Sequence, residues 1–129
     1  MLDMFPRMIF GHLFGDYLFQ NDWMTRNKWK PGPRNAGICA VHCLVYTIIM
    51  AIFLWKIEWY HLVLIFLSHY PIDRYSIAKH FMKLKGNRVD EIMKSGDALP
   101  TSFTVFVYIV IDNTMHLFIL WIIFGVLGL

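Results

Sequence analysis

The stretch HLFGDYLFQ, from His12 to Gln20, carries three polar side chains four residues apart in an otherwise apolar and aromatic segment. Residues four apart in an α-helix lie on the same face, so His12, Asp16 and Gln20 form one polar stripe. Polar side chains of a hydrophobic helix face the interior of a bundle, because lipid offers them no partners. The stretch therefore predicts an inward-facing stripe on one helix of an all-α membrane protein.

The composition of the chain supports this fold class. Of its 129 residues, 57% are hydrophobic, 17% are aromatic and only 16% are charged, and the mean hydropathy is +0.49. A soluble chain of this length buries only a modest part of its surface in its own core. The hydrocarbon of a bilayer can cover the remaining apolar surface. We expect a single integral membrane domain over residues 1–129.

Four apolar segments are candidates for membrane-spanning helices, which need about 20 residues each. They are predicted over residues 4–23, 37–55, 59–81 and 101–127. The third segment contains Pro71, which removes a backbone donor, so a kink is expected there. The predicted fold is a polytopic bundle of about four transmembrane helices.

Two basic connections, residues 24–36 and 79–100, separate these helices, and a short amphipathic cytoplasmic helix is expected around residues 88–94. Four Lys and Arg residues lie in the first connection, and six lie between Arg74 and Lys94. Because cations favour the cytoplasmic side, both termini are predicted to face away from the cytoplasm. The pI of about 9.0 thus reports topology and lipid contact, and no nucleic-acid partner is expected.

Histidine and aspartate recur at helical spacing on the other predicted helices, in HYPID, DNTMH and HCLVY. Imidazole and carboxylate are the ligands of zinc and of non-haem iron or manganese. Helical bundles hold such metals with pairs of these residues on facing helices. The candidate metal ligands are His12, Asp16, His42, His69, Asp73, Asp112 and His116, enough for one or two divalent ions, with zinc favoured. A metal-free proton or hydrogen-bond network remains the alternative.

Three of the polar residues are candidates for catalysis: Asp16 and Asp73 as general base, and Tyr46 as a donor to a substrate oxygen. Four cations near the cytoplasmic side are candidates for binding an anionic headgroup, namely Arg26, Lys28, Arg34 and Arg74. Arg74 is also a candidate partner for Asp73.

The segments GHLFGDYLFQNDWMTRNKW, VHCLVYT, SHYPIDRYSIAK and IDNTMHLFILW, in this order and spacing, resemble a family of bacterial and phage membrane proteins. It is the domain of unknown function 3307 family, and the resemblance covers nearly the whole chain. It implies a multi-pass protein of the bacterial inner membrane, but no reaction. The arrangement is also similar in kind to small membrane proteins described as metal-dependent hydrolases.

The leading functional hypothesis is a metal-dependent hydrolase that takes a lipid or lipid-linked substrate from the cytoplasmic leaflet. A second hypothesis is a proton or metal-ion conducting protein, which would require a homo-oligomer because four helices are few for a transporter. A third is a phage-type membrane interaction protein, for superinfection exclusion or lysis regulation. In that case the basic loops contact a partner or lipid, and the polar core only holds the bundle together.

Overall fold

The computed structural model describes residues 4–55, 57–86 and 98–126, and the regular elements in these ranges are all helical. The elements are α1 (Met4–Leu13), the π-helix η1 (Phe14–Leu18), α2 (Asp22–Asn27), α3 (Pro33–Leu54), α4 (Trp59–Arg74), α5 (Ile77–Leu84), α7 (Ala98–Trp121) and the π-helix η2 (Ile122–Val126). The prediction of an all-α fold is confirmed. The amphipathic helix predicted around residues 88–94 lies outside the described residues.

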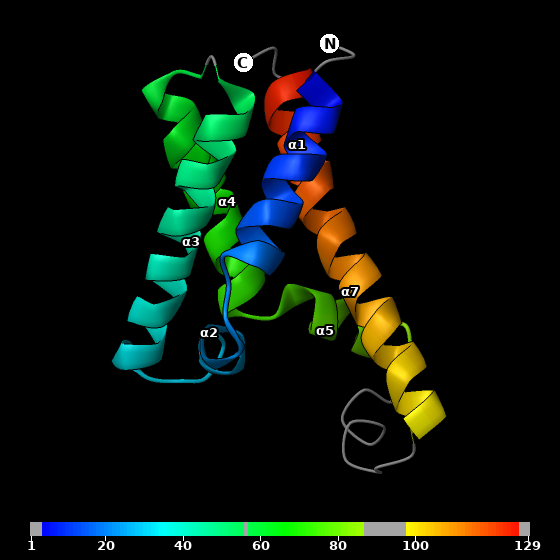
Figure 1. Cartoon of the computed structure of the whole chain (residues 1–129). Coiled ribbons are helices and arrows are strands. Elements are labelled where there is room, and N and C mark those ends of the chain that lie inside the picture. The colour runs from blue at the N-terminus through cyan, green and yellow to red at the C-terminus, as the bar shows by residue number, and fades with distance from the viewer. Residues whose placement is uncertain (1–3, 56, 87–97, 127–129) are drawn as a thin grey trace.

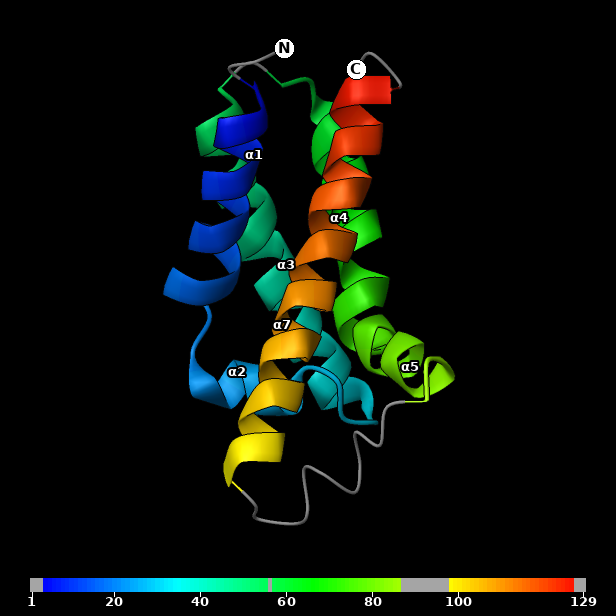
Figure 2. The ribbon, with the colours of Figure 1, turned by 90° about the vertical axis from the view of Figure 1, so that its right-hand side faces the viewer.

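The four longer helices, α1, α3, α4 and α7, lie side by side along the length of the bundle, and successive ones run in opposite directions (Figures 1 and 2). Helix α1 packs on α3 and α7, and α4 packs on the same two helices. The short helices α2 and α5 both lie at one end of this bundle, and the start of α1 and the π-helix η2 lie at the opposite end (Figure 1).

Apolar side chains cover the outside of the bundle as well as part of its core. On α3 an outward stripe of Val41, Leu44, Ile48 and Ile52 is more than half exposed. Polar residues of the same helix, His42 and Thr47 among them, are buried instead. The arrangement is the reverse of a soluble helix, which turns its polar face outward. Two segments, Pro33–Leu54 and Phe103–Val126, are long and apolar enough to cross a membrane.

The helix predicted over residues 59–81 is divided in two, and the division is not at Pro71. Helix α4 continues through Pro71 and ends at Arg74. The break follows at Ser76, whose φ of 48° places it in the left-handed region. A left-handed residue cannot continue a right-handed helix, so α5 leaves in a new direction across the end of the bundle (Figure 1).

The helix predicted over residues 4–23 also ends early. After η1 the chain leaves the helical path near Phe19, and α2 begins with Asn21 as its N-cap. The Asn21 side chain accepts a hydrogen bond from the Met24 backbone N–H at 2.9 Å, which satisfies one of the free donors of the first turn.

Glycines allow the N-terminal helix to approach α3 closely. A Cβ atom added to Gly11 would lie 2.8 Å from the Met50 sulfur, and one added to Gly15 would lie 2.6 Å from the Tyr46 ring. Such distances are below van der Waals contact, so a larger residue at either position requires the facing side chain to shift. The four-residue spacing of two glycines is a common device for close helix packing in membranes. It brings the polar stripe of α1 and η1 against α3.

Candidate metal centre

Four side chains from three helical elements meet in the interior of the bundle. Asp16 comes from η1, His42 from α3, and His69 and Asp73 from consecutive turns of α4. We call these four residues the first ligand group. They are buried or nearly so, with side-chain exposures of 9% for Asp16 and at most 3% for the others.

The nitrogen and oxygen atoms of the first ligand group are spaced as metal ligands are. Asp16 Oδ1 lies 3.2 Å from His42 Nε2 and 3.4 Å from His69 Nε2. Asp73 Oδ2 lies 2.9 Å and 3.3 Å from the same two nitrogens, which are 3.1 Å apart. Metal bonds of about 2.0–2.2 Å place neighbouring ligand atoms roughly 3 to 3.5 Å apart. These buried residues could therefore hold a metal ion.

The hydrogen bonding of the first ligand group is incomplete, as expected for a site whose ligand atoms bind a cation. Asp16 Oδ1 is buried and has no hydrogen-bond partner of suitable geometry among the described residues. Between His42 Nε2 and His69 Nε2 only one nitrogen can carry the shared proton. An unsatisfied carboxylate oxygen in a buried site is costly, and a divalent ion removes that cost. The residues present therefore fit a metal ion.

Lys28 is the cation that contacts this group in the described structure. Its ammonium donates to Asp73 Oδ2 at 2.5 Å and to Gln20 Oε1 at 3.1 Å. Burial opposes the charge of the ammonium, but the attraction of Asp73 and Asp16 outweighs it and raises the pKa of Lys28 above its ordinary value. Lys28 thus points into the bundle from the first basic connection.

Arg74, which the sequence suggested as a partner for Asp73, has a different role. Its Nη1 donates to the backbone carbonyl of Lys30 at 2.6 Å and to that of Lys28 at 3.2 Å. Arg74 therefore fastens the connection between α2 and α3 and so holds Lys28 in place, because both hydrogen bonds end on that segment. The ion pair to Asp73 is made by Lys28 instead.

His12, Tyr46 and His116 lie beside the first ligand group. The Tyr46 hydroxyl is 3.0 Å from His12 Nδ1, and its ring stacks on that of His69 with centroids 3.7 Å apart. The rings of His12 and His116 are also stacked, at 5.2 Å. These histidines and Asp16 form a second set of residues that could hold a metal. The structure thus brings together six of the seven predicted ligands.

Asp112, the seventh, lies at the edge of the site. Its side chain is 20% exposed, and its Oδ2 is 3.7 Å from His116 Nδ1. It belongs to neither set of possible metal ligands. Its position suits a group that faces substrate or solvent, because it is the most exposed of the three aspartates.

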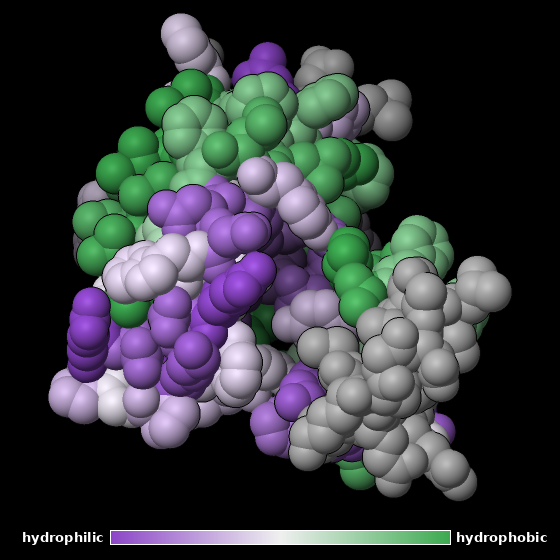
Figure 3. Space-filling model, turned by 60° about the horizontal axis from the view of Figure 1, so that its bottom comes forward, coloured by the Kyte–Doolittle hydropathy of each residue, from purple (hydrophilic) through white to green (hydrophobic). Residues whose placement is uncertain are grey.

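The other predicted headgroup residues lie outside the bundle. Arg26 is exposed and 3.7 Å from Asp22, and Arg34 is exposed in the first turn of α3. Hydrophilic side chains gather at the end of the molecule that comes forward in Figure 3, the end that carries α2, and they border a hollow in the surface.

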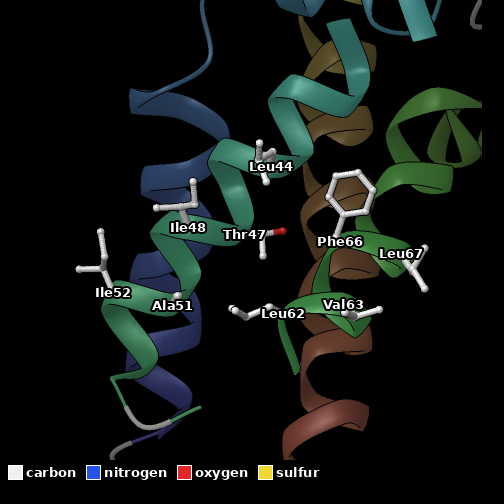
Figure 4. A pocket seen from close by; sticks show the side chains of 9 residues that line it. All are labelled: Leu44, Thr47, Ile48, Ala51, Ile52, Leu62, Val63, Phe66 and Leu67. Carbon is white, nitrogen blue, oxygen red and sulfur yellow. The ribbon is translucent and has the colours of Figure 1, made fainter. Parts of the chain in front are cut away.

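One pocket of the described structure lies away from these residues. It has a volume of about 550 Å³ and lies between α3 and α4, on the outward stripe of α3 (Figure 4). Thr47 is its one polar lining residue, and its hydroxyl already donates to the Cys43 carbonyl at 2.8 Å. An apolar groove without a free polar group does not supply the chemistry of a catalytic site.

Sequence reasoning missed Asn113 and the two packing glycines. Asn113 Oδ1 accepts a hydrogen bond from His12 Nε2 at 2.7 Å, across 101 positions of the chain. The only available signal was its place one turn before His116. The glycines at 11 and 15 did offer a signal, since small residues four apart mark close helix contacts in membranes.

Comparison with known proteins adds a family. The family described as "Protein of unknown function (DUF3307)" matches residues 4–128. No curated protein and no solved structure matches the chain.

Proposed function

Since the chain belongs to the DUF3307 family of proteins of unknown function, we propose a function from its site: a membrane-embedded, metal-dependent hydrolase for a lipid or lipid-linked substrate. The observation that carries this proposal is the first ligand group. Its two imidazole nitrogens and two carboxylate oxygens have five of their mutual distances between 2.9 and 3.4 Å. Zinc is the favoured ion, and iron or manganese would accept the same donors.

A metal ion bound there would activate a water molecule and polarise the bond to be hydrolysed. Asp112 is the aspartate best placed to take up a proton, because Asp16 and Asp73 serve as ligands. This assignment replaces the expectation that Asp16 or Asp73 acts as general base. Tyr46 remains a candidate donor to a substrate oxygen, since its hydroxyl lies among the candidate ligands.

The proposed setting is the bacterial inner membrane, crossed by four helical segments. The outward apolar stripe of α3 and the two segments long enough to cross a bilayer support it. The start of α1 and the π-helix η2 lie at one end of the bundle, and α2, α5 and the connection between α2 and α3 lie at the other (Figure 1). With cations on the cytoplasmic side, substrate would reach the site from the cytoplasmic leaflet. Arg26 and Arg34, which are exposed there, would bind an anionic headgroup.

The test is metal content, measured by inductively coupled plasma mass spectrometry on detergent-purified protein. Wild type should retain zinc, iron or manganese, and His69→Ala should lose it. His80→Ala is the matched control, because His80 is exposed on α5 outside the site. Wild type that binds no metal even after dialysis against zinc would refute the proposal. Proton flux in liposomes by such a metal-free protein would support the conducting alternative.

Activity is tested on vesicles that contain lipid phosphates and lipid esters, with release of phosphate or fatty acid as the readout. We expect release by wild type, loss of release with a chelator, and recovery with added zinc. Release that a chelator does not affect would exclude the metal from catalysis.

A further inference from the structure

We propose that the centre binds a second divalent metal ion, held by His12 and His116 and joined to the first ion through the carboxylates of Asp16 and Asp73. This inference rests on the proposed function. It narrows the substrate class to phosphate esters.

The two aspartates each direct their two oxygens toward different histidine pairs. Asp16 Oδ1 faces the histidines of the first ligand group, whereas its Oδ2 lies 3.4 Å from His12 Nδ1. Asp73 repeats the pattern: Oδ2 faces the same two histidines, and Oδ1 lies 3.7 Å from His116 Nε2. A carboxylate that offers one oxygen to each of two ligand sets is arranged to bridge two ions. Helical bundles with paired metals use carboxylates and histidines of facing helices in this way.

His116 presents a free lone pair to this second position. Its Nδ1 donates to the Asp112 backbone carbonyl at 2.8 Å, so Nε2 carries no proton. The side chain is 2% exposed, and Nε2 has no hydrogen-bond partner among the described residues. A buried lone pair that faces a carboxylate oxygen is unfavourable unless a cation lies between them. A carbonyl that fixes the tautomer is the usual partner of a metal-ligating histidine.

A hydrogen bond to Asn113 fixes the tautomer of His12, as the Asp112 carbonyl fixes that of His116. The Asn113 Nδ2 donates to the Ile109 carbonyl at 2.6 Å, which leaves Oδ1 to accept from His12 Nε2 at 2.7 Å. The lone pair of His12 is therefore on Nδ1, which faces Asp16 Oδ2. At present the Tyr46 hydroxyl donates to it. A metal ion bound to Nδ1 would displace this hydrogen bond, and the Tyr46 hydroxyl would then be free to donate to a substrate oxygen.

The charge of the centre indicates what a second ion is for. If all three aspartates are ionised and Lys28 carries its ammonium charge, the site has two net negative charges. One divalent ion neutralises these charges, and a second gives the site two positive charges. Paired ions about 3.5–4 Å apart are typical of phosphatases and nucleases, where they stabilise the attacking and leaving oxygens. A phosphate ester supplies the matching negative charge, whereas a carboxylic ester does not.

The experiment measures zinc bound per chain by equilibrium dialysis of the purified full chain. Wild type should bind about two equivalents, and His116→Gln should bind about one. Glutamine can still donate to the Asp112 carbonyl, and the remaining equivalent would show that the variant is folded. His80→Gln, the same substitution at an exposed position, should keep both equivalents. Manganese-loaded wild type should give the paramagnetic resonance signal of an exchange-coupled pair, and His116→Gln that of an isolated ion.

The possible failures are distinguishable. One equivalent in both wild type and His116→Gln, without exchange coupling, would overturn the second site and leave the proposed function intact. Two equivalents in both proteins would overturn the role of His116. No metal in wild type would remove the proposed function and this inference together. With two ions bound, hydrolysis of lipid carboxylic esters in preference to lipid phosphates would refute the substrate class.

Discussion

The Lys28 ammonium binds the same carboxylate oxygen, Asp73 Oδ2, that a metal ion would bind. It shares this oxygen with His42 and His69. A cation of the chain at this position balances the buried carboxylates when no metal is bound. It also repels a divalent ion a few ångströms away, because two positive charges at that distance interact strongly in a buried site.

Replacing Lys28 by methionine should therefore tighten metal binding and weaken the metal-free protein. We expect the zinc dissociation constant of Lys28→Met to fall by at least about tenfold, which corresponds to about 1.4 kcal/mol. The metal-free variant should lose on the order of 3 kcal/mol of stability, because Asp73 loses its ion pair. Lys30→Met is the control, since that ammonium bonds only the exposed Asn27 side chain among the described contacts. Equal zinc affinity in wild type and Lys28→Met would contradict the competition.

Asn113 tests the role of the His12 tautomer. Asn113→Leu removes the acceptor of His12 Nε2, so the lone pair is no longer confined to Nδ1. Loss of such an outer partner commonly weakens metal binding by about 10- to 100-fold. We expect a loss of this size for the weaker of the two zinc equivalents, measured by calorimetric titration. Thr114→Val is the control. The hydroxyl of Thr114 is exposed and donates to the Val110 carbonyl outside the site, so this variant should bind zinc as wild type does.

The contact between η1 and α3 depends on the absence of a side chain at position 15. Asp16 lies on a π-helical turn, a type of turn often found at functional sites, and Gly15 beside it packs on the Tyr46 ring. Tyr46 is 1% exposed and stacked on His69, so its ring has no room to retreat. The approach of η1 to α3 and the geometry of the site are therefore linked.

Gly15→Ala should destabilise the protein by about 1–3 kcal/mol, the usual cost of overpacking a core. Gly37→Ala is the matched control: it lies in α3 with no atom within 4 Å of an added Cβ. There alanine should stabilise the helix by about 0.5–1 kcal/mol. Thermal unfolding in detergent measures both changes. A Gly15→Ala protein as stable as Gly37→Ala would show that η1 does not pack on α3 as described.

At the scale of the whole molecule, the site joins the four long elements of the bundle. The ligands come from α1 with η1, α3, α4 and α7. A ligand that binds only the folded state stabilises it, by about 2.7 kcal/mol at a concentration of 100 Kd. Metal should therefore hold the bundle together as well as provide chemistry.

Removal of metal with a chelator should lower the unfolding temperature of wild type, and zinc should restore it. Asp16→Ala should show neither change, because it lacks a ligand common to both sites. His80→Ala should respond as wild type does. An unfolding temperature of wild type that is independent of zinc would show that the folded chain does not bind it.

The helical fold and most of the site residues could be predicted from the sequence, because both depend on local spacing. The pairs His12 and Asp16, and His69 and Asp73, are each four residues apart, and this spacing alone places each pair on one face of a helix. The excess of apolar residues likewise follows from composition. The helix break at Ser76 carried no such signal, since serine is not a residue that usually marks a left-handed turn.

What only the tertiary structure decided is which groups meet. Lys28 rather than Arg74 contacts Asp73, although Arg74 is its neighbour in sequence, because the basic connection folds back under α4. Each aspartate directs its two oxygens toward different histidines, and these histidines come from helices far apart in the chain. The tautomer of His12 likewise depends on Asn113, 101 residues away. Periodicity shows which face of a helix a residue occupies, but distances across a bundle arise only when the helices pack, because no local rule relates their registers.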